Sequence, residues 1–330
     1  MPFTQFTSLD FDEIKSSIKD YIRANTTFTD YDYEGSNLSV LINILAYNTY
    51  LTAYNSNMVA NEVFLDTATL RENVVALAKN IGYVPKSRRA ARAIISFNVT
   101  GIPNIYQTVT LEAGLVCIGS GNNTNLKFSI PERITAQVSN GIASFSNVTV
   151  YEGSYLTQNW TVNSNQTDVK YELNNSFVDT STIRVNVKNT QSDTVREDYS
   201  LVDNIISVKN DSRIYLVQEV NDERYKIIFG DGIIGKKLEN NNYITASYIT
   251  TSGEDGNGAS NFIFSGILFA NGDENIPITS GISLISTNTA SNSGSEIESV
   301  SSVKYFSTRL YSSQYRAVTA RDYEAIVPYI

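Results

Sequence analysis

The stretch Phe229-Gly230-Asp231-Gly232-Ile233-Ile234-Gly235 decides how the middle of this chain is interpreted. Its glycines have the G-x-G-x-x-G spacing of a dinucleotide-binding loop, and Glu254 follows about 20 residues later. That fingerprint requires a helix that begins inside the glycine run. Only residues 236–242 separate the glycines from the next strand-like segment, and Asn240-Asn241-Asn242 is typical of a turn. The stretch therefore predicts the tip of a β-hairpin, a turn without a ligand made by Gly230, Asp231, Gly232 and Gly235, with positive φ at the central Asp-Gly pair.

The segments on either side of this stretch alternate between apolar and polar residues, as half-buried strands do. Turn-forming Gly, Asn and Pro residues separate them. We expect strands at 94–100, 108–118, 143–151, 182–188, 214–219, 225–229 and 243–251. The pattern predicts one or two antiparallel β-domains. Divided in two, they cover residues 91–170 and, with the hairpin, residues 171–265.

Residues 1–90 have helical periodicity instead and predict a helical arm. The residues expected on one face of the first helix are Phe11, Ile14, Ile18, Tyr21 and Ile22. Ser36 is a good N-cap for a second helix that extends to about Phe64, a rod of roughly 40 Å. Thr69 and Glu72 have the spacing of a capping box for a third helix, which Gly82 ends.

The long second helix changes character along its length, from a leucine-rich stripe to a run of tyrosines and asparagines. A lone globular domain gains little from such a rod, whereas a helix in an intermolecular bundle would use its surface. The residues predicted to form this interface are Leu38, Leu41, Leu45, Tyr47, Tyr50 and Tyr54. The alternative, a helix packed only within its own chain, stays open.

Helical signals return after a Gly-, Ser-, Asn- and Thr-rich stretch at 252–296. Ser295 with Glu298, and Thr319 with Asp322, have capping-box spacing, and the second pair predicts a last helix over 320–327. Residues 266–330 are therefore expected to form a loop and the start of a helical C-terminal domain. The fold class predicted for the chain is α+β: an N-terminal helical arm, antiparallel β-domains and a C-terminal helical segment.

The composition argues against most catalytic mechanisms and metal sites. The 330 residues carry a net charge of −9 and include no histidine, so the commonest general base and metal ligand is missing. The single cysteine, Cys117, cannot form an internal disulfide. We expect no catalytic residue, no cofactor and no metal, and a protein that is not an enzyme. The acidic balance disfavours nucleic acid as a partner, and no stretch reaches the roughly 20 apolar residues of a membrane span.

The only basic run lies at residues 86–92 and contains Arg88, Arg89 and Arg92. A nucleic-acid patch is one interpretation of it. A solvated linker, or a patch that faces an acidic neighbouring subunit, is the interpretation that the acidic chain favours.

Several segments together resemble a known family. They are residues 229–235 followed by Gly256-Asn257-Gly258, residues 30–38 followed by 45–49, residues 67–71 followed by 82–85, and Ala317 to Glu324. They lie in the same order as in the baseplate wedge proteins of contractile-tailed (T-even-type) bacteriophages, within the baseplate J-like family. The chain resembles these proteins over most of its length.

The resemblance implies a structural subunit of the ring around the tail hub, which rearranges when the sheath contracts. It implies a helical bundle made by two copies of this protein and one different wedge subunit. Expected partners are copies of itself and other wedge proteins, including a sheath-initiating subunit, with no nucleic acid and no membrane. The expected location is the virion tail baseplate, assembled in the host cytoplasm. In this family substantial sequence follows the matched region, so the chain is expected to be partial.

Two functions from other classes stay open. A β-rich adhesin or glycan-binding protein would use the β-domains, but no secretion signal precedes them and the N-terminal helices do not suit it. A carboxylate-based hydrolase could draw on the 34 acidic residues, although no spacing marks a catalytic pair.

Overall fold

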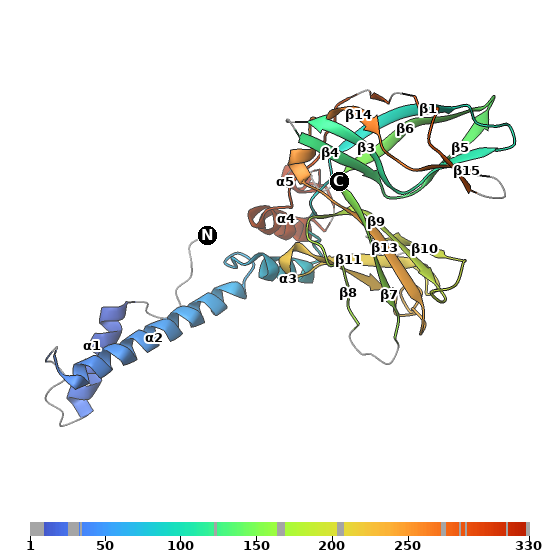
Figure 1. Ribbon diagram of the computed structural model, residues 1–330. Helices are drawn as coiled ribbons and strands as arrows, with labels where there is room; N and C mark the ends of the chain where they lie inside the picture. The colour runs from blue at the N-terminus through green and yellow to red at the C-terminus, as the bar shows by residue number, and fades with distance from the viewer. Residues whose placement is uncertain are drawn as a thin grey trace. The chain divides into compact units, whose positions relative to one another are not determined.

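The chain folds into two compact units, a helical unit of residues 1–84 with 299–330 and a β unit of residues 85–298 (Figure 1). The predicted α+β class is confirmed. The computed structural model describes residues 10–25, 33, 35–121, 124–163, 169–202, 208–271, 275–283, 285–287, 289–314 and 316–327.

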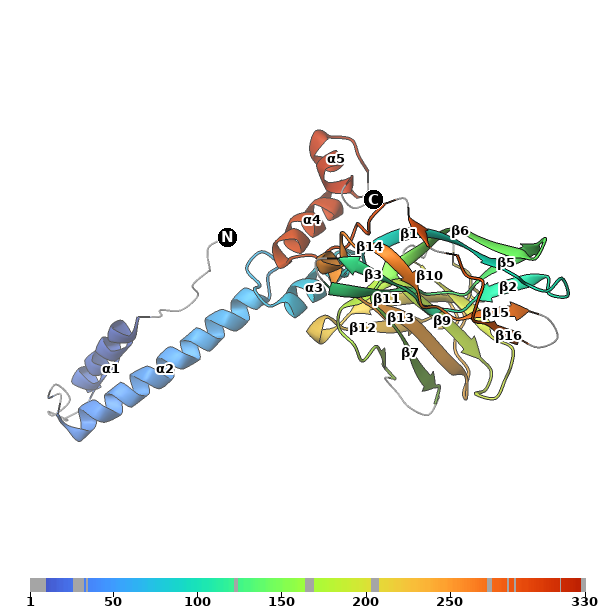
Figure 2. The ribbon, with the colours of Figure 1, turned by 45° about the horizontal axis from the view of Figure 1, so that its top comes forward.

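The helical unit begins with two helices that lie side by side, α1 (Phe11–Asn25) and α2 (Asn37–Glu62) (Figure 2). α1 half-buries the apolar face formed by Phe11, Ile14, Ile18 and Ile22. Tyr21, expected on the same face, is 70% exposed because it lies at the margin of the apolar stripe. The buried residues in the first half of α2 are Ser39, Ile42 and Ala46.

α2 is the long helix that the sequence predicts. The hydroxyl of Ser36 accepts a hydrogen bond from the Ser39 N–H at 3.0 Å, which confirms the N-cap. The helix has 26 residues and ends at Glu62, close to the expected end at Phe64.

The capping of α3 (Arg71–Asn80) differs from the prediction. Leu70 is the N-cap residue, and no side chain within α3 caps the helix. The carboxylate of Glu62 caps it instead, accepting from the Thr69 N–H at 2.7 Å, the Thr69 hydroxyl at 2.6 Å and Asn73 Nδ2 at 2.8 Å. Leu70 and not Thr69 is the N-cap, and no hydrogen bond among the described residues pairs Thr69 with Glu72, so the capping box predicted there is wrong. The last residue of α2 therefore fixes the start of α3.

The C-terminal helices α4 (Val300–Ser313) and α5 (Ala320–Ile326) complete the helical unit. α4 begins one residue after Ser299, whose hydroxyl accepts from the Ser302 N–H, so the capping box predicted at Ser295 and Glu298 is wrong. The box predicted at Thr319 and Asp322 is confirmed. The small core of this unit is formed by Ala68, Val74, Ala78, Tyr83, Val303 and Leu310.

The β unit contains two sheets. The first has the order β14-β3-β4-β6-β5-β2-β15-β16, with β1 paired to β6 and β17, and all its pairs are antiparallel. Its strands are β1 (Arg92–Thr100), β2 (Thr108–Leu111), β3 (Gly114–Gly121), β4 (Thr124–Ile130), β5 (Ile134–Ser139), β6 (Ile142–Glu152), β14 (Ser260–Phe264), β15 (Leu268–Asn271), β16 (Asn275–Ile278) and β17 (Ser286–Thr287).

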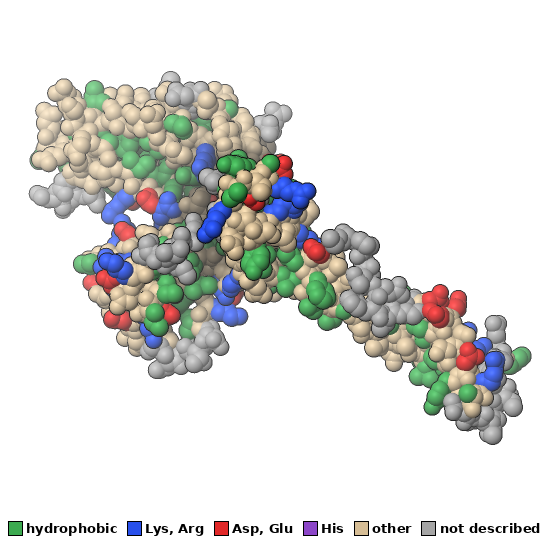
Figure 3. Space-filling model, turned by 180° about the vertical axis from the view of Figure 1, so that it is seen from behind, with side chains coloured by type: hydrophobic (Ala, Val, Ile, Leu, Met, Phe, Trp, Pro, Cys, Tyr) green, Lys and Arg blue, Asp and Glu red, His purple; other side chains and the backbone are tan. Residues whose placement is uncertain are grey.

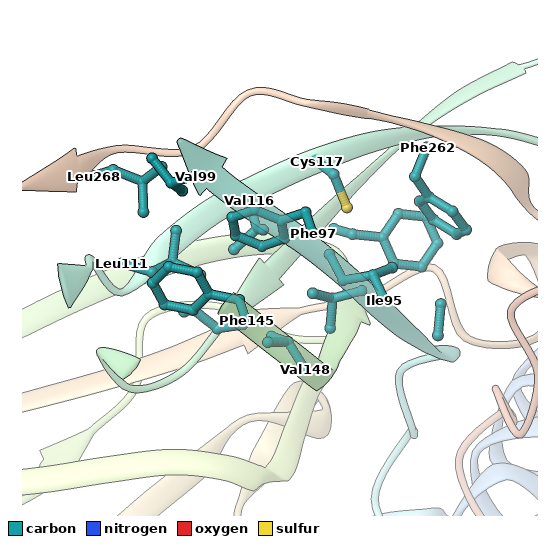
Figure 4. Close-up of a cluster of buried hydrophobic side chains, with 14 of the residues drawn as sticks. Ile95, Phe97, Val99, Leu111, Val116, Cys117, Phe145, Val148, Phe262 and Leu268 are labelled. Carbon is teal, nitrogen blue, oxygen red and sulfur yellow. The ribbon is translucent and has the colours of Figure 1, made fainter. Parts of the chain in front are cut away.

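The core of the first sheet contains two pairs of phenylalanines packed among aliphatic side chains (Figure 4). Phe97 on β1 and Phe145 on β6 stack with ring centroids 4.9 Å apart. Phe128 on β4 meets Phe262 on β14 edge to face, also at 4.9 Å. Since β14 comes more than a hundred residues after β4, this core is complete only when β14 has packed against the earlier strands.

The second sheet has the order β7-β13-β9-β10-β11-β12-β8 and is antiparallel except for the β10–β11 pair. Its strands are β7 (Ser154–Thr161), β8 (Tyr171–Glu172), β9 (Val178–Lys188), β10 (Glu197–Leu201), β11 (Ile214–Glu219), β12 (Tyr225–Phe229) and β13 (Tyr243–Thr250). Short 3₁₀ turns lie at Asn221–Glu223 and Gly253–Gly256.

Side chains join the two edge strands of the second sheet. Gln158 on β7 donates from Nε2 to the Glu172 carbonyl of β8 at 2.9 Å and accepts from the Asn174 N–H at 3.0 Å. The ring of Trp160 lies edge to face with Tyr171, with centroids 5.9 Å apart. The sheet thus curls until its edges meet, and both edges are protected from pairing with other chains.

The boundaries between the β-domains differ from those expected. The second sheet is an insertion between β6 and β14 of the first, so the division falls at Gly153 and not at residue 170. Residues 266–287, expected as loop, supply β15 to β17 of the first sheet. Local periodicity identifies strands but not their partners, and pairs such as β3 with β14 are distant in sequence. Gly153, the residue at this division, has φ +131°, and a Cβ there would collide with the Thr250 carbonyl oxygen.

Two buried carboxylates connect the two sheets by hydrogen bonds where the sheets meet. Glu152, at the end of β6, accepts from the Thr251 hydroxyl at 2.6 Å and from the Ser252 N–H at 3.0 Å, just beyond β13. Asp179 on β9 is fully buried and accepts from the Ala90 N–H at 2.9 Å and the Ser181 hydroxyl at 2.7 Å. Each carboxylate therefore bonds segments that belong to different sheets or lead into them.

The Glu62 cap yields a prediction about pH. Burial alone would raise the pKa of this carboxyl, but the hydrogen bonds from Thr69, Asn73 and the Leu70 N–H outweigh burial and lower the pKa to about 2. Because the folded pKa lies below the ordinary value of 4.5, the cap stabilises the helical unit fully above about pH 4.5. Its contribution is lost as the pH falls toward 2.

We expect Glu62→Gln to cost about 1 kcal/mol at neutral pH, as the loss of a helix cap does. The variant should also flatten the acid limb of a thermal unfolding series followed by circular dichroism. Glu72→Gln, an exposed position in the first turn of α3, is the matched control. An equal loss in both variants would contradict the role given to Glu62.

Candidate functional site

The six interface residues predicted on α2 do not lie on one face. Leu41, Leu45, Tyr47 and Tyr54 are exposed, whereas Leu38 and Tyr50 are half-buried. At 3.6 residues per turn, the leucines Leu38, Leu41 and Leu45 lie on roughly the opposite side of the helix from Tyr47, Tyr50 and Tyr54. The predicted interface therefore separates into two groups, and only the tyrosine side continues along the helix.

That side forms a regular stripe, which we call the α2 seam, with the spacing i, i+4, i+7, i+11, i+14 and i+18. The seam consists of Val40, Ile44, Tyr47, Leu51, Tyr54 and Met58. Alternating steps of four and three residues are typical of a coiled-coil seam. The predicted set included two of these residues and omitted Val40, Ile44, Leu51 and Met58, although the 4-3 spacing was present in the sequence.

The seam is uncovered in the described part of the helical unit. Ile44 is 59% exposed, Val40 51% and Leu51 40%. α2 also carries no charged side chain before its last residue, Glu62. A helix that faces water on this side normally carries charged residues there. Both features are typical of a helix face that packs against another protein chain. Hydrophobic side chains are visible on the surface of the helical arm (green in Figure 3).

No helix among the described residues has the length and apolar character needed to cross a membrane.

The glycine stretch is a compact loop but not the tip of a β-hairpin, so that prediction is wrong. β12 pairs with β11 and β8, while β13 pairs with β7 and β9. Residues 236–242 carry the chain across the sheet before β13 begins. Local sequence patterns could not distinguish this crossing from a direct return beside β12.

Asp231 organises the loop. Its Oδ1 accepts from the Ile234 and Ile233 N–H groups, both at 2.8 Å, and these bonds hold the pKa of the carboxyl below its ordinary value. Gly232 and Gly235 have positive φ, as expected of glycines in the loop, but Asp231 does not. Gly230 is needed for another reason, because a Cβ there would collide with the backbone of Gly235. No helix starts within the loop, so it lacks the geometry of a dinucleotide site.

The basic run at 86–92 is part of the β unit and not a solvated linker. Arg88 pairs with Glu296 at 2.5 Å and lies over the ring of Phe177 at 4.5 Å. The Ser87 hydroxyl lies 2.8 Å from that of Thr180. Arg88 is thus used in the packing of its own chain.

The described residues contain no group of three or more His, Cys, Asp or Glu side chains that could hold a metal ion. Cys117 is buried, and burial raises the pKa of its thiol to about 12. The thiol is therefore protonated at neutral pH and is a poor nucleophile.

Comparison with known proteins agrees with the resemblance inferred from the motifs. Residues 10–83 match a family described as "Baseplate wedge protein gp6-like, helical domain", and this segment contains the α2 seam. The chain is also 26% identical, over 345 residues, to the baseplate wedge protein gp6 of Enterobacteria phage T4. This similarity covers 96% of the chain and 49% of that protein, so the chain spans about half the length of the curated relative it matches. The predicted relationship to baseplate wedge proteins is confirmed.

The glycine loop yields a prediction about stability. Gly230→Ala should lower the thermal unfolding midpoint of the β unit, because the added methyl group meets backbone atoms that cannot move aside. Gly232→Ala is the control: its Cβ would meet nothing closer than Lys237 Cβ at 3.5 Å, so only the strain of positive φ, about 1 kcal/mol, is expected. If Gly230→Ala is the milder of the two, the close approach described here is wrong. Saturable binding of NAD to the purified chain would contradict a loop without a ligand.

Proposed function

We propose that this chain is a structural subunit of a phage tail baseplate wedge, located in the virion and assembled in the host cytoplasm. The similarity to a baseplate wedge protein over 96% of the chain is the observation that carries the proposal. The partners are copies of this chain and other wedge proteins, including a sheath-initiating subunit. The protein acts by binding and conformational change, without catalysis, cofactor, nucleic acid or membrane.

The α2 seam supports an intermolecular helical bundle. A seam with a period of 3.5 residues packs knobs into holes against another helix that wraps around it. Burying one Val, Leu or Ile side chain fully gives about 1.5–3 kcal/mol. With three such residues in the seam, the bundle contact would be permanent and largely apolar. The bundle consists of two copies of α2 with a helix of a different wedge subunit.

A second contact joins neighbouring wedges in the ring and changes when the sheath contracts. The polar stretch at residues 252–296 is not a free loop that could serve this contact, because its strands β14 to β17 belong to the first sheet. The segment around α5 is the better candidate, because Val318, Tyr323 and Val327 are 81%, 55% and 64% exposed. These three side chains make a small patch, and contacts that must rearrange are usually smaller than permanent ones.

The rival functions are an adhesin or glycan-binding protein and a carboxylate-based hydrolase. An adhesin would expose its binding residues on the β unit and would have no use for the uncharged seam of α2. A hydrolase would turn over a cell-wall glycan, and that activity would be lost when one carboxylate pair is mutated. The match of residues 10–83 to the helical domain of wedge proteins favours the structural role over both.

The seam is tested with Ile44→Glu combined with Leu51→Glu. We expect the double variant to fold, since both side chains are exposed in the chain itself. Its incorporation into tail particles in a complementation assay should fall at least tenfold, because two charges would be buried in the bundle without partners.

Thr52→Glu combined with Ser56→Glu is the matched control, with the same added charge on exposed residues off the seam. If the seam variant enters particles as well as this control does, the bundle through this face is wrong. If the unaltered chain is absent from purified tail particles, the wedge assignment itself fails.

A further inference from the structure

A polar groove lies between the two sheets of the β unit. It consists of two adjoining cavities, of about 770 and 520 Å³, which share Arg133, Asn186 and Arg196 in their walls. One wall is the turn after β4, residues 131–133, and the other is the outer face of β9 and β10.

Strand alternation explains why the groove is polar. Ile183, Val185 and Val187 of β9 point into the core of the second sheet. The residues between them, Arg184, Asn186 and Lys188, therefore point to the opposite face and are half-buried. Thr245 and Ser247 of β13 extend this face, since they pair with Asn186 and Arg184.

One cation of the groove already has partners. Arg184 forms an ion pair with Glu132 of the first sheet. Its Nη1 also donates to the carbonyl oxygens of Ser181 and Ile183, both at 2.9 Å. Arg184 thus connects the sheets and neutralises Glu132, and it is not available to another ligand.

Three other cations gather in the smaller cavity, whose remaining walls are Asn186, Thr194 and Thr245. Among the described residues no ion pair involves Arg133 or Lys188, and Arg196 meets only Asp198, at 3.9 Å with both side chains exposed. Such an exposed pair contributes little. Three like charges in one cavity repel one another, and on a chain of net charge −9 they form a surface suited to an anion.

We propose that this cationic groove, formed by Arg133, Lys188 and Arg196, binds carboxylates on an acidic segment of a neighbouring protein subunit. This deepens the proposed function and rests on it for the identity of the neighbour. A nucleic acid fits less well, because the adjoining cavity presents Glu112 and Asp198 to any backbone that continues past the cations. The amide and hydroxyl groups of Asn186 and Thr245 suit a peptide segment that carries both donors and acceptors.

The proposal is tested first with the purified chain and hexaglutamate as the probe, by calorimetry at low ionic strength. The groove variant replaces Arg133, Lys188 and Arg196 with Gln. The control variant makes the same change in charge outside the groove, at the exposed lysines Lys127, Lys170 and Lys209. We expect hexaglutamate to bind the unaltered chain and the control equally, and the groove variant at least tenfold more weakly. Binding should also weaken with added salt.

Three results would overturn the proposal. The first is equal binding of hexaglutamate to the groove variant and the control, and the second is no binding to the unaltered chain. The third is a short single-stranded DNA that binds more tightly than hexaglutamate and depends on the same three cations. The thermal unfolding midpoint of the groove variant should equal or exceed that of the unaltered chain, because repulsion among the cations is removed. If the triple variant is less stable, Lys188→Gln alone, expected to weaken binding at least threefold, replaces it.

The second test asks whether the neighbour belongs to the same particle. Incorporation of the groove variant into tail particles should fall below that of the control variant. Equal incorporation would refute a neighbour in the assembly while leaving the wedge assignment intact. If the unaltered chain is absent from particles, the proposed function fails, and the hexaglutamate titration still decides whether the groove binds carboxylates.

Discussion

The hydrogen bonds made by two buried carboxylates, Glu152 and Asp179, are the constraint on which the β unit depends. A carboxylate taken out of water is costly unless hydrogen-bond donors surround it. Here the donors come from segments that the other sheet also needs: Thr251 and Ser252 after β13, and Ala90 before β1. Satisfying these groups fixes where the second sheet is inserted into the first. The groove between the sheets, with Arg184 paired to Glu132 across it, has a defined shape for the same reason.

Features set by a few neighbouring residues could be predicted from the sequence. Ser36 and Thr319 cap their helices as expected, and the alternation along β9 and β13 identifies both strands. The predictions that failed concern partners at a distance. Thr69 donates to Glu62 instead of capping α3 with Glu72, and the Glu298 carboxylate accepts from the Lys86 N–H, 212 residues away. The hairpin predicted at the glycine loop is wrong for the same reason, because strand order and not loop sequence determines whether β12 and β13 are neighbours.

The α2 seam was only partly predicted, for a geometrical reason. Leucines and tyrosines were grouped by composition along the helix, whereas contact with another chain depends on the angle around it. Only the 4-3 spacing brings Val40, Ile44 and Leu51 together with the tyrosines. α1 covers a different face, where Ser39, Ile42 and Ala46 are buried, so the helix has an internal side and an uncovered side. The groove cations could not be grouped at all from sequence, since Arg133, Lys188 and Arg196 come from different strands and turns.

Trp160, the only tryptophan of the chain, lies where the two edges of the second sheet meet, against Tyr171. Its position makes the protein its own spectroscopic reporter. Fluorescence excited selectively at the indole reports on the closure of this one sheet. It does not report on the helical unit, which contains no tryptophan. Separation of β7 from β8 would expose the half-buried ring to water and shift its emission to longer wavelength. Melting of the helices alone would leave the emission unchanged, so fluorescence and circular dichroism together distinguish the unfolding of the two units.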